Sequence, residues 1–396
     1  MTDPGAKAVV VVGAHTMALG VVRALGEAGV PVVVLHYDAR DMAHVSRYVM
    51  AEHRVPPPHT HEPEFAEALR LLATRLGGSM LLPVSDEATV AVARHKEALE
   101  RDFVVACPAW DVVQHFIEKR RTYQLAAAAG VATPLTAVPS TIEEAEVAAR
   151  GIGFPLLVKP SQSHLFYERF RRKMVEVRTM AELLEQVGAA HRAGLEVMLQ
   201  ECVPGADSEV VNYNAYSWGE EALVEFTARQ LRKAPPRFGS PRVVVSEDIQ
   251  AIIGPGRAML KALGFQGYAC CEFKRDPRDG AYKILDVNGR HNLSSILAVR
   301  CGLNFPLLHY RHLMYGELPG PCDFTKGLYW TDFFRDAAYS LRYLFEEAYS
   351  ARDYLAPYLG LHCDATFDRR DPRPAAKRLS TLVTSLGGRA RQAWAP

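Results

Sequence analysis

Two acidic side chains and an amide near residue 280 form the set of residues best suited to chemistry. Glu272 lies in one strand-like segment, and Asp286 and Asn288 lie in the next, with a turn-forming Asp-Pro-Arg-Asp-Gly sequence between them. Side chains alternate along a strand, so Asp286 and Asn288 share a face, and a hairpin brings Glu272 opposite Ile284 or Asp286. Facing carboxylates repel, and Mg²⁺, which favours carboxylate and amide oxygens, would relieve that repulsion. The equally supported alternative is a solvated strand face on which Lys274 neutralises Glu272.

Two lysines and one turn add groups that can contact a nucleotide. Lys159 closes the apolar segment 154–158, and a cation at a strand end either meets a phosphate or extends into water. Lys119, in a helical segment with arginines beside it, has the same two interpretations. A strand end enters a turn at residues 201–205, where backbone groups either face an adenine edge or simply form the turn.

The segments that must position these groups alternate between strand and helix patterns. An apolar run at residues 9–12, a helical pattern at 17–28 and a second apolar run at 30–35 predict a βαβ unit with a parallel sheet. The alternation continues to about residue 106, which indicates an open α/β domain. A single helix is expected over residues 112–129, and β-rich segments dominate the later half. The predicted fold class is therefore α/β, with α+β character in the later part.

Composition excludes several classes of function. The 396 residues include 46 Lys and Arg against 45 Asp and Glu, a net charge of +1 that gives no global footprint for nucleic acid or an anionic membrane. The start lacks a secretory pattern, and no run approaches the ~20 apolar residues of a transmembrane helix. Seven cysteines without a CxxC spacing favour reduced thiols. We therefore expect a cytoplasmic protein with no nucleic-acid or membrane partner.

Two further patterns are weak. Gly13 and Gly20 do not have the GxGxxG spacing that cradles a dinucleotide pyrophosphate, and Asp38 alone is little support for a ribose site. His59 and His61 can form a metal pair, but no third ligand lies nearby in the sequence. An NAD-dependent oxidoreductase is therefore the most distant rival function, and an ordinary loop is the favoured interpretation of the histidines.

The order of the stronger motifs resembles the ATP-grasp superfamily. Two segments look like its nucleotide-binding segments, a third resembles its hinge, and the hairpin, ending in acid-x-Asn-x-Arg, resembles its magnesium-binding strands. The first three are residues 118–134, 154–160 and 200–205. The resemblance covers about residues 8–310. Three short segments favour a resemblance to the carboxylate–amine ligase branch, which includes D-aspartate ligase-like enzymes. These segments are residues 30–31, 46–48 and 83–87.

This resemblance implies a role for each candidate residue. ATP phosphates would be held by Lys119 and Lys159, adenine by backbone groups of Glu201 and Val203, and ribose by Glu209 or, less favourably, Asp207. One or two Mg²⁺ ions, with Mn²⁺ as an alternative, would be bound by Glu272, Asp286 and Asn288. The transferred phosphoryl group or the substrate carboxylate would be held by Arg290, and weaker phosphate candidates are Arg229 and Lys233.

The sequence departs from the family pattern at four places. Glu118 stands where many relatives have Asp, and residues 161–164 replace a glycine-rich loop. Asp286 is shorter than the common Glu, and Gly289 replaces a frequent Pro. None of these changes removes a charge that the chemistry requires. Residues 160–173 are expected to supply a mobile lid that keeps water from a reactive intermediate.

The resemblance also implies an architecture and an activity. The expected parts are an N-terminal α/β domain, a small lobe, a large lobe with the metal site and a C-terminal extension, over residues 1–112, 113–194, 195–320 and 321–396. The expected activity activates a carboxylate as an acyl phosphate and joins it to an amine, releasing ADP and phosphate. The rivals are a ligase with another nucleophile and a catalytically silent nucleotide-binding protein. Small-molecule carboxylate and amine substrates are the expected partners, and a homodimer is left open.

Overall fold

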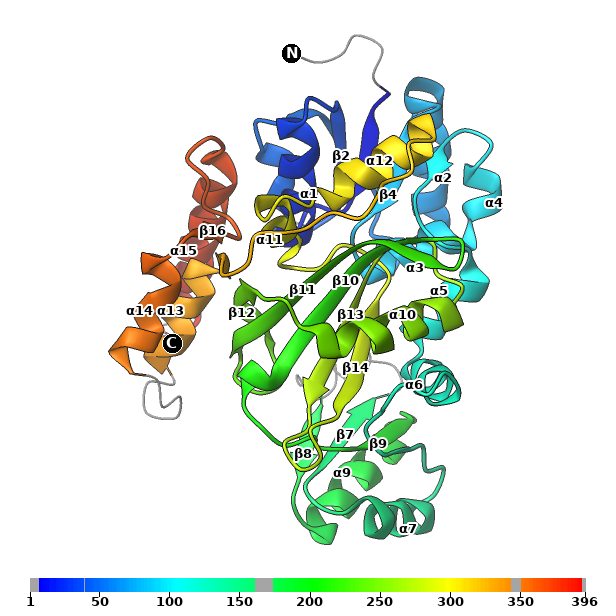
Figure 1. Ribbon diagram of the computed structural model, residues 1–396, viewed down its shortest axis with the longest axis vertical. Helices are drawn as coiled ribbons and strands as arrows, with labels where there is room; N and C mark the ends of the chain where they lie inside the picture. The colour runs from blue at the N-terminus through cyan, green and yellow to red at the C-terminus, as the bar shows by residue number, and fades with distance from the viewer. Residues whose placement is uncertain (1–6, 39, 161–173, 343–349, 394–396) are drawn as a thin grey trace.

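Three sheets, one after another along the chain, organise the molecule (Figure 1). The computed structural model describes residues 7–38, 40–160, 174–342 and 350–393 of the chain. The lid expected at residues 160–173 therefore lies, apart from its first residue, outside the described residues. Among the helices of the described part, none combines the length and the apolar character needed to cross a membrane.

The N-terminal sheet is parallel, with the strand order β3-β2-β1-β4-β5, which confirms the predicted βαβ unit. Its strands are β1 (Val9–Val12), β2 (Val32–His36), β3 (Val49–Arg54), β4 (Met80–Pro83) and β5 (Val104–Val105). The connecting helices are α1 (Thr16–Glu27), η1 (Ala43–Val45), α2 (Glu62–Leu76), α3 (Asp86–Arg94) and α4 (Lys96–Leu99). The strand order reverses at β1, and the crevice at the carboxyl ends of β1 and β4 is where such sheets bind ligands.

The single helix expected over residues 112–129 is two helices in the structure. These are α5 (Trp110–Ile117) and α6 (Lys119–Ala128), separated by the extended backbone of Glu118, with φ −88° and ψ 102°. The break allows each helix to bury its own apolar residues, Val113 and Phe116 on α5 and Tyr123 and Ala126 on α6. Its consequence for the site is that Lys119 becomes the first residue of a helix.

A four-stranded antiparallel sheet forms the small lobe, in the order β6-β9-β7-β8. Its elements are β6 (Thr136–Ala137), α7 (Ile142–Ile152), β7 (Leu156–Pro160), β8 (Val175–Val177), α9 (Met180–Arg192) and β9 (Val197–Glu201). Thr141 and Thr179 cap the two helices by accepting hydrogen bonds from backbone amides. The lobe boundary expected at residues 194–195 is too early, because β9 pairs with both β6 and β7.

The large lobe contains a seven-stranded sheet in the order β14-β13-β10-β11-β12-β15-β16. Its strands are β10 (Val210–Trp218), β11 (Glu221–Ala234), β12 (Ser240–Ser246), β13 (Gly267–Arg275), β14 (Tyr282–Asn288), β15 (Tyr329–Thr331) and β16 (His362–Asp364). The helices along the same part of the chain are η2 (Asp207–Glu209), η3 (Gln250–Ile252), α10 (Ile253–Ala262), α11 (Ser295–Arg300), α12 (Phe305–Tyr315), α13 (Phe333–Arg342), α14 (Ala351–Leu359) and α15 (Arg373–Ala393). The predicted β13–β14 hairpin is confirmed. Within the expected C-terminal extension, residues 321–396, β15 and β16 add two strands to this sheet.

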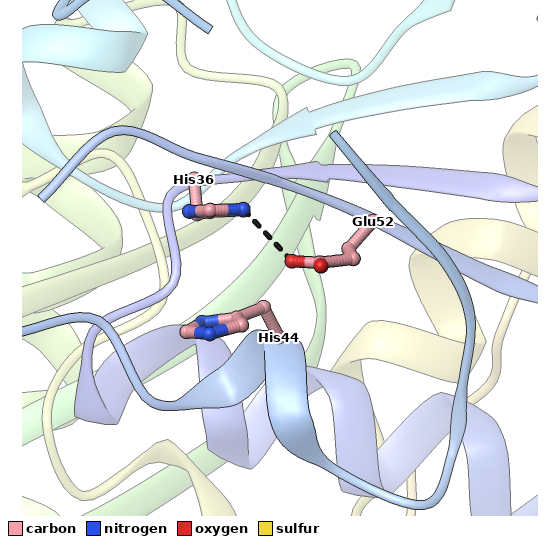
Figure 2. Close-up of side chains that lie close together, drawn as sticks. All are labelled: His36, His44 and Glu52. Atoms are coloured by element: carbon pink, nitrogen blue, oxygen red, sulfur yellow. Dashed lines mark ion pairs between the residues drawn. The ribbon is translucent and has the colours of Figure 1, made fainter. Parts of the chain in front are cut away.

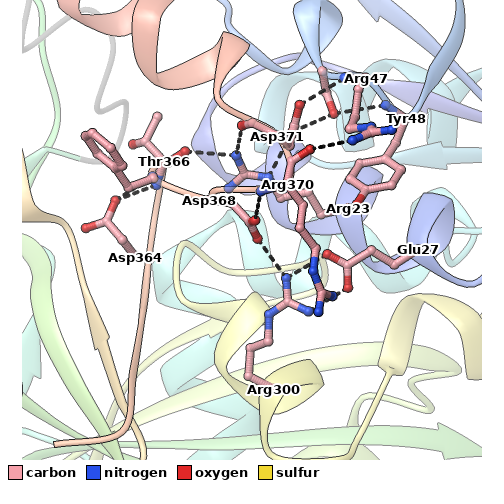
Figure 3. A network of polar contacts seen from close by, with 12 residues as sticks. Arg23, Glu27, Arg47, Tyr48, Arg300, Asp364, Thr366, Asp368, Arg370 and Asp371 are labelled. Atoms are coloured by element: carbon pink, nitrogen blue, oxygen red, sulfur yellow. Dashed lines mark hydrogen bonds and ion pairs between the residues drawn. The ribbon is translucent and has the colours of Figure 1, made fainter.

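The segment between β16 and α15 returns to the N-terminal domain, where a polar network holds it (Figure 3). Arg23 and Asp371 form an ion pair with 3.0 Å between Nε and Oδ2, and their side chains are 2% and 0% exposed. The hydroxyl of Ser46 and the backbone amide of Arg47 also donate to Asp371, at 2.7 and 2.9 Å. The carboxylate of Asp371 therefore satisfies three buried or half-buried donors of the N-terminal domain.

Candidate active site

The hairpin brings its two acids together on one face. Glu272 and Asp286 are directly opposite each other across β13 and β14, and Asn288 lies two residues beyond Asp286 on the same face. The carboxylate of Glu272 accepts a hydrogen bond of 2.8 Å from the Gln230 amide. The sequence alternative, in which Lys274 neutralises Glu272, is wrong: the Lys274 ammonium donates to two backbone carbonyls of the turn after β9.

Two lysines of the small-lobe side approach these acids. Lys119, at the start of α6, forms an ion pair with Asp286. Lys159, near the end of β7, donates a hydrogen bond of 2.5 Å to the Gln200 side chain. Burial, together with the positive charge of Lys119, lowers the pKa of Lys159 to about 8. The structure thus places Lys119 against Asp286, and Lys159 near enough for the charges of Asp286 and Glu272 to act on it.

The turn after β9 has most of its polar groups engaged. Burial alone would raise the pKa of the Glu201 carboxyl, but hydrogen bonds from Arg278 and Lys283 outweigh burial and hold the pKa below its usual value. The Glu201 amide donates to the Leu135 carbonyl at 2.8 Å, and the Val203 carbonyl accepts from a lysine. Because the Glu201 amide and the Val203 carbonyl already have partners, the backbone groups that stay as candidates for adenine binding are the Glu201 carbonyl and the Val203 amide.

The carboxylates of the two ribose candidates differ in how closely other groups of the protein hold them. Asp207 accepts hydrogen bonds from the backbone amides of Lys233 and Arg237, at 3.2 and 2.9 Å. Glu209 ends η2, and its carboxylate lies 3.9 Å from the Arg275 guanidinium. Glu209 is thus the less committed acid and stays the preferred candidate for ribose.

Of the two weaker phosphate candidates, the structure brings one to the acids. Lys233 lies 3.5 Å from Glu272, because irregularities in β11 between Gln230 and Lys233 shift the alternation of side chains. Arg229 precedes these irregularities, so it faces the opposite side of the strand from Gln230. There it forms a two-pronged ion pair of 2.7 Å with Glu247. The structure does not bring Arg229 to the hairpin acids.

Arg290 connects the hairpin to the N-terminal domain. It follows β14, and its guanidinium forms a fork with Asp86, with distances of 2.7 Å from Nε to Oδ1 and 2.9 Å from Nη2 to Oδ2. Asp86 is the first residue of α3, so it lies just past the carboxyl end of β4. Sequence reasoning noted residues 83–87 only as a family feature and missed this role for Asp86. The Asp86 carboxylate thus binds the Arg290 guanidinium at the position that a substrate carboxylate or phosphoryl group would take in the predicted role of Arg290.

Polar side chains of the N-terminal domain line the same edge of the parallel sheet, and sequence reasoning missed these as well. The Tyr37 hydroxyl lies 2.9 Å from the Ser85 hydroxyl, at the ends of β2 and β4. After β1, His15 pairs with the buried carboxylate of Asp41 at 2.9 Å. The hydrogen bond to Asp41 outweighs desolvation and raises the pKa of His15. The only sequence signal for these groups is their place directly after apolar strands.

Comparisons with known proteins are consistent with this geometry. No family model matches the chain. The chain is 25% identical over 270 residues to D-aspartate ligase from Enterococcus faecium, which covers 63% of each protein. It is 26% identical over 203 residues to D-alanine–D-alanine ligase B from Pseudomonas syringae, covering 48% of the chain and 61% of that relative. The matches therefore span about three fifths of the length of these relatives.

Solved structures share the fold. An L-amino acid ligase from Bacillus licheniformis superposes with a TM-score of 0.61 at 18% identity, covering 78% of this chain and 74% of the other. N5-carboxyaminoimidazole synthetase from Staphylococcus aureus, complexed with ADP, gives a TM-score of 0.62 at 11% identity, covering 82% and 81%. Together these likenesses show that the chain has the fold of the ATP-grasp superfamily and resembles carboxylate–amine ligases in sequence.

Proposed function

We propose that the protein is an ATP-dependent ligase that joins a carboxylate to an amine, releasing ADP and phosphate. The observation that carries the proposal is the ion pair of Lys119 with Asp286, with Lys159 near enough for the charges of Glu272 and Asp286 to act on it, and the position of Arg290 between this cluster and the N-terminal crevice. The curated relatives are named as ligases of D-aspartate and D-alanine, and one structural neighbour holds ADP, which supports the same assignment. Cytoplasmic location stays a prediction, and a homodimer stays open.

The donor set of the hairpin fits Mg²⁺. Two carboxylates and an amide oxygen share one face, and all three are the hard oxygen ligands that Mg²⁺ prefers. Lys119 pairs with Asp286 and Lys233 with Glu272, so both acids of this face already attract positive charge, which supports the proposal. We propose that Glu272, Asp286 and Asn288 would hold Mg²⁺, whose chemistry when bound is to neutralise charge on the transferring phosphate oxygens.

The chain's own residues then account for the two steps of the reaction, which are phosphoryl transfer to the carboxylate and attack of the amine on the acyl phosphate. Lys119 and Lys159 bind phosphate oxygens while a substrate carboxylate oxygen attacks the γ-phosphorus and ADP leaves. Arg290 exchanges Asp86 for the substrate's carboxyl or phosphoryl oxygens and offsets their charge. The amine nitrogen then attacks the acyl carbon, phosphate departs with one former carboxylate oxygen, and the amine loses a proton.

An isotope experiment tests this chemistry. Carboxylate and amine pairs are screened for ADP release, beginning with D- and L-amino acids. With the active pair, ¹⁸O from the labelled carboxylate should appear in inorganic phosphate, because the acyl–phosphate bond breaks on the carbon side. Label in AMP, with release of pyrophosphate, would contradict the proposal. ADP release that needs a carboxylate and a thiol, but no amine, would favour the ligase with another nucleophile.

Arg290→Ala should reduce trapping of the intermediate more than it reduces ATP binding. With ATP and the correct carboxylate, hydroxylamine should form a hydroxamate, and loss of the guanidinium should lower its rate by about 10²-fold or more. The measurements are the hydroxamate rate and the Kd for ATP. Arg257→Ala is the matched control, since Arg257 also forms a fork with a carboxylate, Glu225, but on the exposed face of α10. Equal losses in both variants would remove Arg290 from the mechanism.

ATP affinity should fall as the pH rises above about 8. The free protein releases the Lys159 proton near that pH, whereas bound phosphate favours the ammonium and raises the pKa toward or above 10.5. Between the two values, each pH unit should weaken ATP binding by up to about tenfold, and below pH 8 this dependence should vanish. Titrations of Lys159→Arg, whose side chain stays charged, should lack this dependence. A wild-type affinity that is flat across this range would contradict the phosphate role.

A further inference from the structure

A second polar cluster lies on the N-terminal sheet, and it is made of residues to which the proposed ligase chemistry assigns no role. His36 ends β2, His44 is the middle residue of η1, and Glu52 lies on the edge strand β3 (Figure 2). The His36 Nε2 lies 2.8 Å from a carboxylate oxygen of Glu52. One donor atom from each of the three side chains lies within 4.8 Å of the other two. No other group of three His, Cys, Asp or Glu side chains is gathered in this way within the described ranges.

The fold, and not the local sequence, assembles this group. Strands β2 and β3 are parallel neighbours, and His36 is paired with Arg54, two residues beyond Glu52, so His36 and Glu52 lie near each other at the same end of the two strands. The short helix η1 in the connection between them then places His44 against His36, with ring centroids 4.5 Å apart and ring planes at 17°. The neighbouring His53 projects to the other face of β3 from Glu52, because side chains alternate along a strand.

One nitrogen of the cluster has no hydrogen-bond partner among the described residues. The Nδ1 of His44 is buried from solvent, and within the described part of the chain nothing hydrogen-bonds to it. Buried polar atoms in folded proteins nearly always have a partner, and each exception calls for an explanation. A bound ligand at this position is such an explanation.

We propose that His36, His44 and Glu52 bind a zinc-class divalent cation, Zn²⁺ in the first instance. Two imidazoles and one carboxylate are a donor set that suits Zn²⁺, with water or another ligand in the fourth position. Mg²⁺ would not compete well here, because it prefers oxygen ligands and dehydrates reluctantly. The site is thus chemically distinct from the oxygen-only face of the β13–β14 hairpin.

Zn²⁺ binding requires a modest rearrangement of the two rings. Bonds of about 2.0–2.1 Å in a tetrahedral site set the donors roughly 3.4 Å apart, so donors that now lie within 4.8 Å of one another must approach by up to about 1.4 Å. The nearly parallel rings must also turn, because ring nitrogens bind a metal in the plane of the ring. His44 is only half-buried and is carried by a three-residue helix, so it is the ligand with room to move.

The ion would tie the edge strand to its neighbours. It would cross-link β2, η1 and β3. Between η1 and β3 lie Ser46 and Arg47, which hold the C-terminal segment through Asp371. Since the unfolded chain lacks the site, binding would stabilise the folded protein in proportion to the logarithm of the Zn²⁺ concentration above Kd. The expected signature is therefore a melting temperature that rises with Zn²⁺.

Calorimetry on the full chain tests the site. Tag-free protein, treated with chelator and dialysed into excess Mg²⁺, is titrated with Zn²⁺, and one ion per chain should bind. His44→Ala and Glu52→Gln should each weaken binding by at least 10- to 100-fold. His53→Ala is the matched control, from the opposite face of the same strand, and should bind as the wild type does. Co²⁺ in place of Zn²⁺ should give visible absorption bands that His44→Ala loses.

The outcomes separate the site from adventitious binding. Absence of one-to-one binding in the wild type overturns the proposal, as does equal Zn²⁺ affinity in the wild type and in both ligand variants. Each variant is first shown to be folded by its melting curve in chelator. Glu52→Gln, at an exposed position, carries the test if His44→Ala does not fold.

Discussion

Asp286→Asn should reduce the rate of ADP release by on the order of 10³-fold while leaving the melting temperature nearly unchanged. The substitution keeps the shape of the side chain but removes the charge that pairs with Lys119 and that would face Mg²⁺. Stabilisation of transferring charge by a bound metal amounts to several kcal/mol, which corresponds to about this factor in rate. The measurement is kcat for ADP release with the active substrate pair, across a range of Mg²⁺ concentrations.

The same hairpin supplies the control for this prediction. Asp279 lies in the turn between β13 and β14, is exposed, and accepts a hydrogen bond only from the local Ala281 amide among the described residues. Asp279→Asn should therefore leave kcat unchanged. Wild-type ADP production by purified Asp286→Asn at every Mg²⁺ concentration would show that the metal assignment is wrong.

Asp371→Ala should lower the free energy of unfolding by roughly 3–5 kcal/mol, the range found when one partner of a buried ion pair is removed. The variant leaves the Arg23 guanidinium buried without its carboxylate, and it also removes an acceptor from Ser46 and Arg47. Urea denaturation, followed by circular dichroism, measures the change.

Two further variants separate charge burial from loss of packing. The double variant Arg23→Met with Asp371→Leu should recover much of the lost stability, because apolar replacement of both partners removes the uncompensated charge. Lys261→Ala breaks an ion pair with Glu220 that is exposed on both sides, and its denaturation midpoint should match the wild type. If Asp371→Ala also matched the wild type, the network in Figure 3 would not anchor the C-terminal segment.

Local patterns in the sequence were sufficient to predict one main unit of the N-terminal sheet and one of the large-lobe sheet. The apolar runs flanking α1 predicted a βαβ unit, and the Asp-Pro-Arg-Asp-Gly turn predicted the β13–β14 hairpin, because period and turn chemistry act over a few residues. The likeness to ATP-grasp proteins supplied the order of the lobes. Neither source required information about distant contacts.

The failures of sequence reasoning all depend on contacts between distant residues or on irregular backbone. Asp86 and Arg290 are 204 positions apart, so no local pattern shows that they pair. The break at Glu118 follows from which residues α5 and α6 bury, and irregularities in β11 decide that Lys233, but not Arg229, faces the acids. The place of β9 in the small lobe likewise follows from its pairing with β6 and β7, which its apolar sequence does not reveal.

The pairing of Arg23 with Asp371 has a consequence for the order in which the protein matures on the ribosome. The two residues are 348 positions apart, so at synthesis rates of about 5–20 residues per second Arg23 emerges roughly 20–70 s before its partner exists. During that interval the N-terminal domain either leaves the Arg23 guanidinium hydrated or stays incompletely closed around α1. The native arrangement of the first domain is therefore completed only after Asp371 has been translated, and a nascent chain that stalls before residue 371 would display that open surface to chaperones.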